Sequence, residues 1–263
     1  MVSRRTLLKG IIAVSVISAV STIYPMYIET NYITTTELEI DLGLGLKAIQ
    51  ISDTHFASSN FDPNKIIDTI KSYSPDIIFH TGDVITYLDG FEDAVEFIGK
   101  LSEISPIYIV AGNHDHWSGL GSKGLKENLE KIGEVYVLNN EAKLYDKLWV
   151  VGVDDPYTYH DDIDKAMKNI HGGYPVVLLA HSPQIIDKVN SRIGLVLAGH
   201  THGGQVRLPF IGAIHVPLPS KYRKYDYGLF EVKATYMFVT RGIGTSFFPI
   251  RFNCPPEVVV INL

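Results

Sequence analysis

The sequence predicts an α/β fold in which two packed β-sheets are flanked by helices. Two observations predict it. After Gly45 a pattern of strand, loop and helix repeats along the chain, whereas the C-terminal part loses the helices and shows short strands between Gly- and Pro-rich turns. With 263 residues, 46% of them hydrophobic, the chain can bury a large core.

The elements follow from local patterns. Charged and apolar residues alternate over Glu37–Ile40 and predict a strand. A cap, an early proline and helical spacing of apolar residues predict a helix over Asn64–Tyr73, and Phe91–Leu101 shows the same spacing. Weaker helical patterns cover Lys123–Ile132 and Asp161–Ile170. The remaining predicted strands are Leu46–Ile51, Ile77–Phe79, Ile107–Val110, Leu148–Val153, Val176–Ala180 and Leu195–Ala198, then Phe230–Val232, Tyr236–Thr240 and Val258–Leu263 as antiparallel strands.

The first 28 residues differ from the rest. A basic head with Arg4 and Arg5 precedes a charge-free stretch from Gly10 to Ile28, which indicates a targeting segment. The paired arginines resemble a twin-arginine export signal, with an ordinary signal peptide or membrane anchor as the alternative. Cleavage and anchoring both stay open, and both predict an extracytoplasmic protein, membrane-anchored or secreted. We divide the chain into this export signal or anchor (1–28), a linker and first strand (29–45), and one catalytic domain (46–263).

Charge and cysteine content exclude some classes. A formal net charge of -6 argues against nucleic acid as a partner bound through a basic surface. It does not exclude a phosphorylated small molecule, because bound metal ions can supply local positive charge. The single cysteine, Cys254, rules out a disulfide within the chain.

Five short segments carry the residues suited to catalysis. Each follows a run of aliphatic and β-branched residues, so we expect each on a loop at the C-terminal end of a strand, along one sheet edge. Carboxylates, an amide oxygen and imidazoles together suit a pair of divalent metal ions. The metal-competent side chains in these segments are Asp53, His55, Asp83, Asn113, His181, His200 and His202.

Each segment alone has an ordinary alternative. The side chains of Asp53 and His55 are expected on the same side of an extended strand end, but Asp53 could equally cap a helix. Gly82 permits a tight turn that would face the Asp83 carboxylate inward. The run from Gly112 to Asp115 (Gly-Asn-His-Asp) is more specific, because an amide oxygen is an unusual metal ligand and a histidine next to a carboxylate is typical of acid–base groups. Together the five segments predict a site that binds divalent metal ions.

The order Asp-x-His, Gly-Asp, Gly-Asn-His-Asp, His and Gly-His-x-His resembles the calcineurin-like metallophosphoesterase superfamily, over nearly all of residues 46–263. Ala198–Pro209, Thr240–Gly244 and Arg251–Glu257 further resemble a prokaryotic exported phosphodiesterase subgroup that often carries twin-arginine signals. The resemblance implies the metallo-dependent phosphatase fold, a four-layer αββα sandwich of two mixed β-sheets flanked by helices.

The resemblance also implies a role for each site residue. Asp83 would bridge two metal ions. His114 would donate a proton to the leaving oxygen or stabilise the transition state, and Asp115 would orient its ring. The first ion would be held by Asp53, His55 and His202, and the second by Asn113, His181 and His200.

The predicted function is a dinuclear-metal phosphoesterase that hydrolyses phosphodiester bonds by a metal-bridging hydroxide. The substrate is expected to be an envelope, lipid-linked or nucleotide-linked phosphodiester. A phosphomonoesterase or pyrophosphatase on the same site is the enzymatic alternative, and a non-catalytic metal-binding envelope protein is the alternative of another class. The donor set does not distinguish Mn, Fe, Zn or Ni. Expected partners besides the substrate are the membrane, through the N-terminal segment, and the twin-arginine export machinery.

Residues outside the motifs leave two alternatives each. Five aromatic residues either form an apolar rim suited to a lipid-like substrate or pack in the core or in turns: Tyr157, Tyr159, Phe210, Phe247 and Phe248. Four basic residues either bind a phosphate or an anionic headgroup or are solvated charges on a loop: Arg207, Lys221, Arg223 and Lys224. His116 and Trp117 either line the pocket or pack in a loop. We expect a structural role for His80, and surface or loop positions for His160, His171 and His215.

Overall fold

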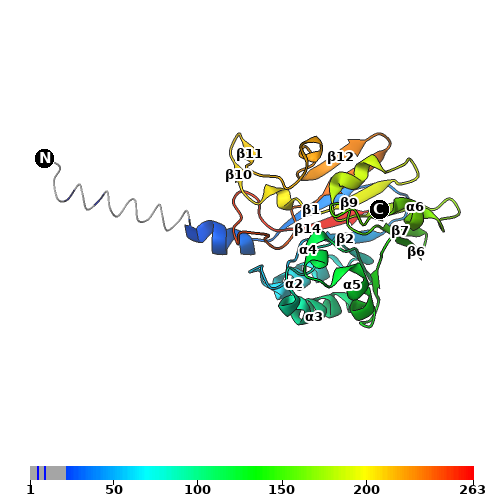
Figure 1. The fold of residues 1–263 in the computed structure, drawn as a ribbon, viewed down its shortest axis with the longest axis horizontal. Helices are drawn as coiled ribbons and strands as arrows, with labels where there is room; N and C mark the ends of the chain where they lie inside the picture. The colour runs from blue at the N-terminus through cyan, green and yellow to red at the C-terminus, as the bar shows by residue number, and fades with distance from the viewer. Residues whose placement is uncertain (1–4, 6–8, 10–21) are drawn as a thin grey trace.

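The computed structural model describes Arg5, Lys9 and residues 22–263, and within them the strands form two six-stranded sheets and one small two-stranded sheet (Figure 1). In spatial order the first sheet contains β1 (Thr34–Glu39), β14 (Glu257–Asn262), β2 (Lys47–Ile51), β3 (Ile77–His80), β4 (Ile107–Ile109) and β5 (Val135–Val137). The second contains β12 (Gly228–Val232), β13 (Thr235–Val239), β9 (Leu195–Ala198), β8 (Val176–Leu179), β7 (Leu148–Gly152) and β6 (Glu141–Tyr145). Both sheets mix parallel and antiparallel pairs, which confirms the predicted fold class.

Helices cover the outer face of each sheet. The first sheet is covered by α2 (Pro63–Tyr73), α3 (Phe91–Ser102) and α5 (Gly121–Leu129), and the second by α6 (Ile163–Met167) and the short η4 (Pro183–Asp187). The start of α2 follows the predicted pattern, because the Asp62 carboxylate accepts a hydrogen bond from the Asn64 N–H (3.0 Å) and Pro63 occupies the first turn. The remaining short helices are η1 (Tyr24–Ile28), η2 (Glu29–Asn31), η3 (Leu88–Gly90), α4 (Asn113–Trp117), η5 (His202–Gly204) and η6 (Ser220–Tyr222).

Strand alternation divides the core into layers. Along β3, Ile78 faces the helices that cover the first sheet, whereas Ile77 and Phe79 pack between the sheets against residues such as Val150. All four side chains are fully buried. A third apolar layer lies between the second sheet and α6. Three apolar layers separate four layers of secondary structure, which is the αββα order.

Parallel pairing brings the functional loops to one place. In the first sheet β2, β3 and β4 run parallel, and in the second β7, β8 and β9 do so. The carboxyl ends of each set therefore meet at a single sheet edge, where ligands commonly bind in α/β proteins.

Several elements differ from the sequence predictions. The strands β5 and β6 were not predicted, because the first is three residues long and the second is a partly exposed edge strand. The late strands are not simply antiparallel: β13 pairs with β9 in parallel, and β14 pairs with β1 in parallel and with β2 in antiparallel direction. Insertion of a late strand between two early ones leaves no local sequence signal. The predicted helix over Asp161–Ile170 is confined to α6.

The predicted export segment, residues 1–28, lies outside the described residues apart from Arg5, Lys9 and 22–28. Its last part forms η1. A hydrogen bond joins η1 to the domain, because the Arg251 N–H donates to the backbone carbonyl of Pro25 (2.9 Å). Among the described residues, no helix has both the length and the apolar character needed to cross a bilayer.

Candidate metal centre

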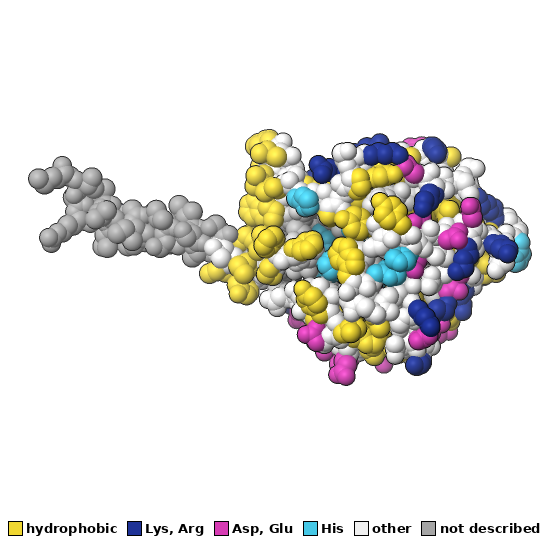
Figure 2. Space-filling view, viewed as in Figure 1, with side chains coloured by type: hydrophobic (Ala, Val, Ile, Leu, Met, Phe, Trp, Pro, Cys, Tyr) yellow, Lys and Arg dark blue, Asp and Glu magenta, His cyan; other side chains and the backbone are white. Residues whose placement is uncertain are grey.

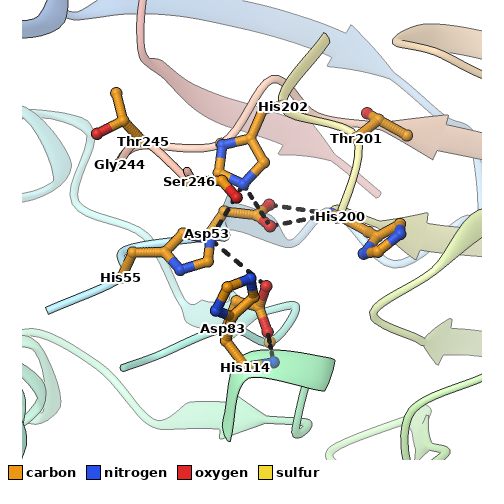
Figure 3. Close-up of polar contacts among 12 residues, drawn as sticks. Asp53, His55, Asp83, His114, His200, Thr201, His202, Gly244, Thr245 and Ser246 are labelled. Carbon is orange, nitrogen blue, oxygen red and sulfur yellow. Dashed lines mark hydrogen bonds and ion pairs between the residues drawn. The ribbon is translucent and has the colours of Figure 1, made fainter. Parts of the chain in front are cut away.

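The loops after β2, β3, β4, β8 and β9 bring all seven predicted metal-competent side chains to one buried site between the sheet edges. Figure 3 shows Asp53, His55, Asp83 and His202 turned toward one another. None of the seven side chains is more than 5% exposed. Three overlapping groups have donor atoms within 4.8 Å of one another, and they contain Asp53, His55, Asp83, His114, His181 and His202.

The backbone reaches this geometry in a way that differs from the prediction. Asp53 and His55 do not continue the extended strand, because both have left-handed backbone conformations with φ of 55° and 49°. Asp83, His200 and His202 are left-handed as well. These side chains converge through tight turns rather than through strand alternation. Asp and His tolerate this region better than most residues, but it remains costly and is typical of functional sites.

Two glycines allow the loops to approach so closely. A Cβ at Gly82, which has φ of 94°, would lie 2.6 Å from Nδ1 of His181. A Cβ at Gly112 would lie 2.3 Å from an oxygen of Asp83. The glycines before Asp83 and Asn113 therefore leave room for the ligand side chains themselves.

The first predicted ligand set is compact. Nε2 of His202 lies 3.0 Å from Nε2 of His55 and 3.4 Å from Oδ1 of Asp53. At most one proton can lie between two ring nitrogens that face each other. The arrangement instead fits nitrogen lone pairs directed at a common cation, whose ligand bonds would be about 2.0–2.1 Å long.

The second set has the same character, and Asp83 lies between the two. Nε2 of His181 is 3.1 Å from the amide oxygen of Asn113 and 3.2 Å from Nδ1 of His200. Oδ2 of Asp83 lies 3.2 Å from Nε2 of His181 and 3.4 Å from Nε2 of His55. One carboxylate oxygen thus lies within 3.4 Å of a histidine nitrogen from each set.

Hydrogen bonds on the far sides of the rings fix which nitrogen faces the site. Nδ1 of His181 donates to the Thr81 carbonyl (2.8 Å), and Nε2 of His200 donates to the Pro217 carbonyl (3.0 Å). Nδ1 of His55 contacts the Thr86 hydroxyl at 2.9 Å. In each ring the other nitrogen is left for a cation, which is how metal-binding histidines are usually oriented. These orienting partners were not predicted, because two of them are backbone carbonyls and leave no sequence motif.

Burial sets the protonation of the site. It lowers the pKa of His55 and of His200 to about 3, so both rings are neutral as ligands must be. Burial also raises the pKa of Asp53 to about 7. For His181 burial alone lowers the pKa, but the neighbouring Asp83 carboxylate outweighs it and raises that pKa to about 10. A cation would replace the proton held there, so metal binding should release protons.

His114 and Asp115 lie on the short helix α4, whereas a loop was predicted here. The His114 N–H donates to Oδ1 of Asp83 (2.8 Å), and its ring packs edge-on against His55 with centroids 4.6 Å apart. The predicted role of Asp115 in orienting the ring of His114 is wrong, because its carboxylate forms no hydrogen bond with that ring. Its carboxylate accepts hydrogen bonds from the backbone N–H groups of Gly112, Val84 and Ile85 instead. Asp115 therefore holds the β3 and β4 loops together.

A cavity of about 530 Å³ opens beside the metal ligands. Aromatic side chains border it: the ring of Tyr157 lies 4.3 Å from that of His200, and Trp117 lies 4.9 Å from His114, both between centroids. Phe247 and Phe248 line the cavity too, whereas Tyr159 and Phe210 do not. His215 is exposed in a loop, as predicted, and it also lines the cavity.

The basic residues of the neighbouring loop point elsewhere. Arg207 forms an ion pair with Asp226 (2.7 Å), and Lys221 pairs with Asp187. Nε of Arg223 donates to a backbone carbonyl, and none of these side chains lines the cavity. His80 is buried beside Thr54, in agreement with its predicted structural role, and His116 pairs with Asp154 (2.7 Å).

The loop between β13 and β14 supports the site from behind. The fully buried guanidinium of Arg251 donates to the carbonyls of Gly244, Cys254 and Arg241. In the loop that it holds, the Gly244 N–H donates to the Asp53 carbonyl (2.7 Å). Thr240–Gly244 and Arg251–Glu257 were noted for their resemblance to the exported subgroup, but their role in supporting the site was not predicted.

Comparisons with known proteins agree with this geometry. Residues 46–204 match the family model described as "Calcineurin-like phosphoesterase". The chain is 31% identical to the uncharacterized metallophosphoesterase YkuE of Bacillus subtilis, over 99% of this chain and 97% of that protein. It is 29% identical to the phosphodiesterase YaeI of Escherichia coli, over 82% of each chain, and 29% identical to an uncharacterized metallophosphoesterase of Aquifex aeolicus, over 84% and 86%.

The family model spans more than half of the chain and includes every segment that supplies the buried donors. The arrangement of those donors fits divalent cations. The chain belongs to the calcineurin-like phosphoesterase family of metal-dependent phosphoester hydrolases.

Proposed function

We propose that this protein is an exported two-metal phosphodiesterase. The observation that carries the proposal is the position of Asp83 Oδ2, within 3.4 Å of one histidine from each ligand set. A carboxylate that is shared in this way is what two adjacent cations require. Such cations, when bound, supply a water nucleophile of lowered pKa and neutralise charge on the phosphate.

The protein's own residues have distinct tasks in this proposal. Asp53, His55 and His202 hold one cation, Asn113, His181 and His200 hold the other, and Asp83 bridges them. His114 faces the cavity beside these ligands, where its ring can donate a proton to the departing oxygen or stabilise the transition state. Asp115 positions the loops that carry Asp83 and Asn113.

The substrate class follows from the walls of the cavity. They combine the metal ligands with Trp117, Tyr157, Phe247 and Phe248, and among the described residues that line the cavity there is no lysine or arginine. A phosphodiester with an apolar or aromatic substituent suits such walls better than a highly charged substrate. The name of the relative YaeI, a phosphodiesterase, is in line with this choice. Envelope phosphodiesters linked to a lipid or a nucleotide belong to this class, and export would bring the enzyme to them.

A substrate panel on the metal-loaded protein tests the proposal. We expect hydrolysis of bis(p-nitrophenyl) phosphate to exceed that of p-nitrophenyl phosphate and of pyrophosphate. Asp83→Asn should abolish it, whereas Asp76→Asn, at the opposite end of β3, should not. Faster hydrolysis of the monoester or of pyrophosphate would replace the diesterase assignment, and activity that survives Asp83→Asn would refute the shared site.

A further inference from the structure

We propose that three charge-free segments beside the cavity form a surface that docks on a lipid bilayer and seats the mouth of the metal centre against it. The segments are residues 22–28, 208–214 and 246–250, together called the apolar face. The idea that substrate then enters from the membrane rests on the proposed function, whereas docking itself does not.

The apolar face exposes large side chains to an unusual degree. Phe210 is fully exposed at the turn of the hairpin formed by β10 (Arg207–Leu208) and β11 (Gly212–Ala213). Phe247 is 80% exposed and Phe248 69%. Ile23 and Tyr27 add two more exposed side chains. Figure 2 shows hydrophobic side chains gathered at the end of the molecule where η1 and the β10–β11 hairpin lie, next to exposed histidines.

Hydrogen bonds join the three segments into one surface. Residues 251 and 252 form the link: the Arg251 N–H donates to the Pro25 carbonyl, and the Phe252 N–H donates to the Gln205 carbonyl, both at 2.9 Å. The Gln205 side chain in turn donates to the Phe248 carbonyl (3.3 Å). Backbone and side-chain hydrogen bonds therefore connect the segments of the apolar face.

The same surface borders the cavity. Ile214, Phe247, Phe248 and Ile250 line it together with His114, His200 and His202. Figure 3 shows Ser246, the first residue of the third segment, near His202. Whatever covers the apolar face therefore lies at the entrance to the metal centre.

Two features favour a bilayer over a protein partner as the occupant. The exposed aromatic side chains stand on separate loop tips, which suits insertion into a fluid interface. The chain that leads into the apolar face is also charge-free from Gly10 onward and follows a basic head, as expected of a segment that partitions into a membrane. The protein carries a net charge of -6, but the apolar face itself carries none, so anionic lipids would not repel it directly.

A site-directed probe tests the docking. In the full-length, metal-loaded protein, Phe210→Cys is labelled with an environment-sensitive fluorophore, which is selective because Cys254 is buried. Tyr174→Cys is the matched control: Tyr174 is an exposed aromatic residue just before β8, at the sheet edge opposite the metal centre. Vesicles of phosphatidylethanolamine and phosphatidylglycerol, with a nitroxide quencher on the acyl chains, are then added.

We expect a blue shift and quenching at position 210 and neither at position 174. Both variants carry the same N-terminal segment, so the difference between them reports on the apolar face. Equal responses at the two positions would overturn the proposal. A blue shift without vesicles that grows with protein concentration would also overturn it, because a second copy would then be the occupant.

Hydrolysis separates docking from the proposed function. In the variant Phe210→Ser with Ile211→Ser, neither residue lines the cavity, so hydrolysis of soluble bis(p-nitrophenyl) phosphate should be unchanged. Hydrolysis of a fluorogenic phosphodiester lipid in vesicles should fall about tenfold, and Tyr174→Ser should leave both rates unchanged. An equal fall on both substrates would contradict the entry of substrate from the membrane. Inactivity of the unmodified protein on both would refute the phosphodiesterase assignment and leave the probe measurement valid.

Discussion

The two sheets contribute to the metal centre in different ways. Loops of the first sheet supply every anionic donor, Asp53 and Asp83, together with His55 and Asn113. Loops of the second sheet supply only imidazoles: His181, His200 and His202. Cations in this site would be bound by charge from one sheet and by neutral nitrogen from the other. The difference suggests that metal binding fastens the sheets together as well as preparing the chemistry.

Removing charge from the first sheet should have the largest effect. Asp83→Asn should lower turnover about 10³-fold or more, since in the proposed two-metal site it removes a charged ligand shared by both ions, and it should reduce the content of both ions. Substitution in the second sheet, His200→Ala, should deplete one ion only. Elemental analysis and phosphodiester hydrolysis measure both outcomes. Equal metal loss in the two variants would erase the proposed difference between the sheets.

The first sheet also supplies the one candidate acid. His114→Ala should lower turnover about 10²-fold or more while both ions stay bound, because proton transfer and not metal binding is lost. The matched variant Trp117→Phe keeps an aromatic neighbour beside the same ring and should change turnover much less. If His114→Ala lost its ions, His114 would have to be assigned as a ligand, which its place near His55 and Asp83 would permit.

Metal removal should weaken the attachment of the two sheets to each other and so lower the thermal stability of the protein. A ligand at 100 times its Kd stabilises the folded state by about 2.7 kcal/mol per site, so chelation should lower the melting temperature by about 5 °C or more. Thermal unfolding with and without EDTA measures the shift. In Asp83→Asn the shift should nearly vanish. A full shift in that variant would place the stabilising metal elsewhere.

A second joint between the sheets does not depend on metal and should contribute less. Glu257 of β14 is paired with Arg241 (2.7 Å) and accepts a hydrogen bond from Thr240, both next to β13. Burial alone raises the pKa of Glu257, but Arg241 and the hydrogen bonds outweigh it and hold that pKa below its usual value. The stabilisation is therefore complete above about pH 4.5 and is lost as the pH falls through the lower folded-state value.

Glu257→Gln should accordingly reduce the free energy of unfolding by about 1–2 kcal/mol at pH 7 and by much less near pH 3. Urea denaturation of both proteins at the two pH values measures the difference, with Glu96→Gln, an exposed pair with Lys100, as the control. A difference that does not change with pH would show that packing rather than charge is responsible.

The sequence predicted the site better than the conformation that builds it. Residue types and their order brought Asp53, His55 and Asp83 together, because each follows a buried strand. The left-handed turns at these residues could not be predicted, since Asp and His adopt such backbone angles only when the surrounding structure enforces them. Asp115 illustrates the same limit. It follows His114 in the sequence and was therefore predicted to orient that ring, but both of its carboxylate oxygens accept hydrogen bonds from backbone N–H groups.

The fold shows a similar division. Long apolar runs and the capped helix α2 follow from local pattern, and their bounds differ little from prediction. The short β5, the edge strand β6 and the pairing of β14 depend on contacts far apart in sequence. The support that Arg251 gives to the loop beside Asp53 is of the same kind, because backbone carbonyls accept its hydrogen bonds and carry no sequence signature.

The place of β14 has a consequence for biosynthesis. Every other described strand precedes β14 in the chain, yet β14 lies between β1 and β2. When Asp53 and Asp83 have emerged from the ribosome, the nascent chain therefore still lacks the strand beside β2. That strand becomes available only when residues 257–262 emerge. Pairing over such separations is slow. The metal centre should accordingly mature only after translation has passed these residues, and a chain that stops before β14 should bind metal poorly even though all seven predicted ligands are present.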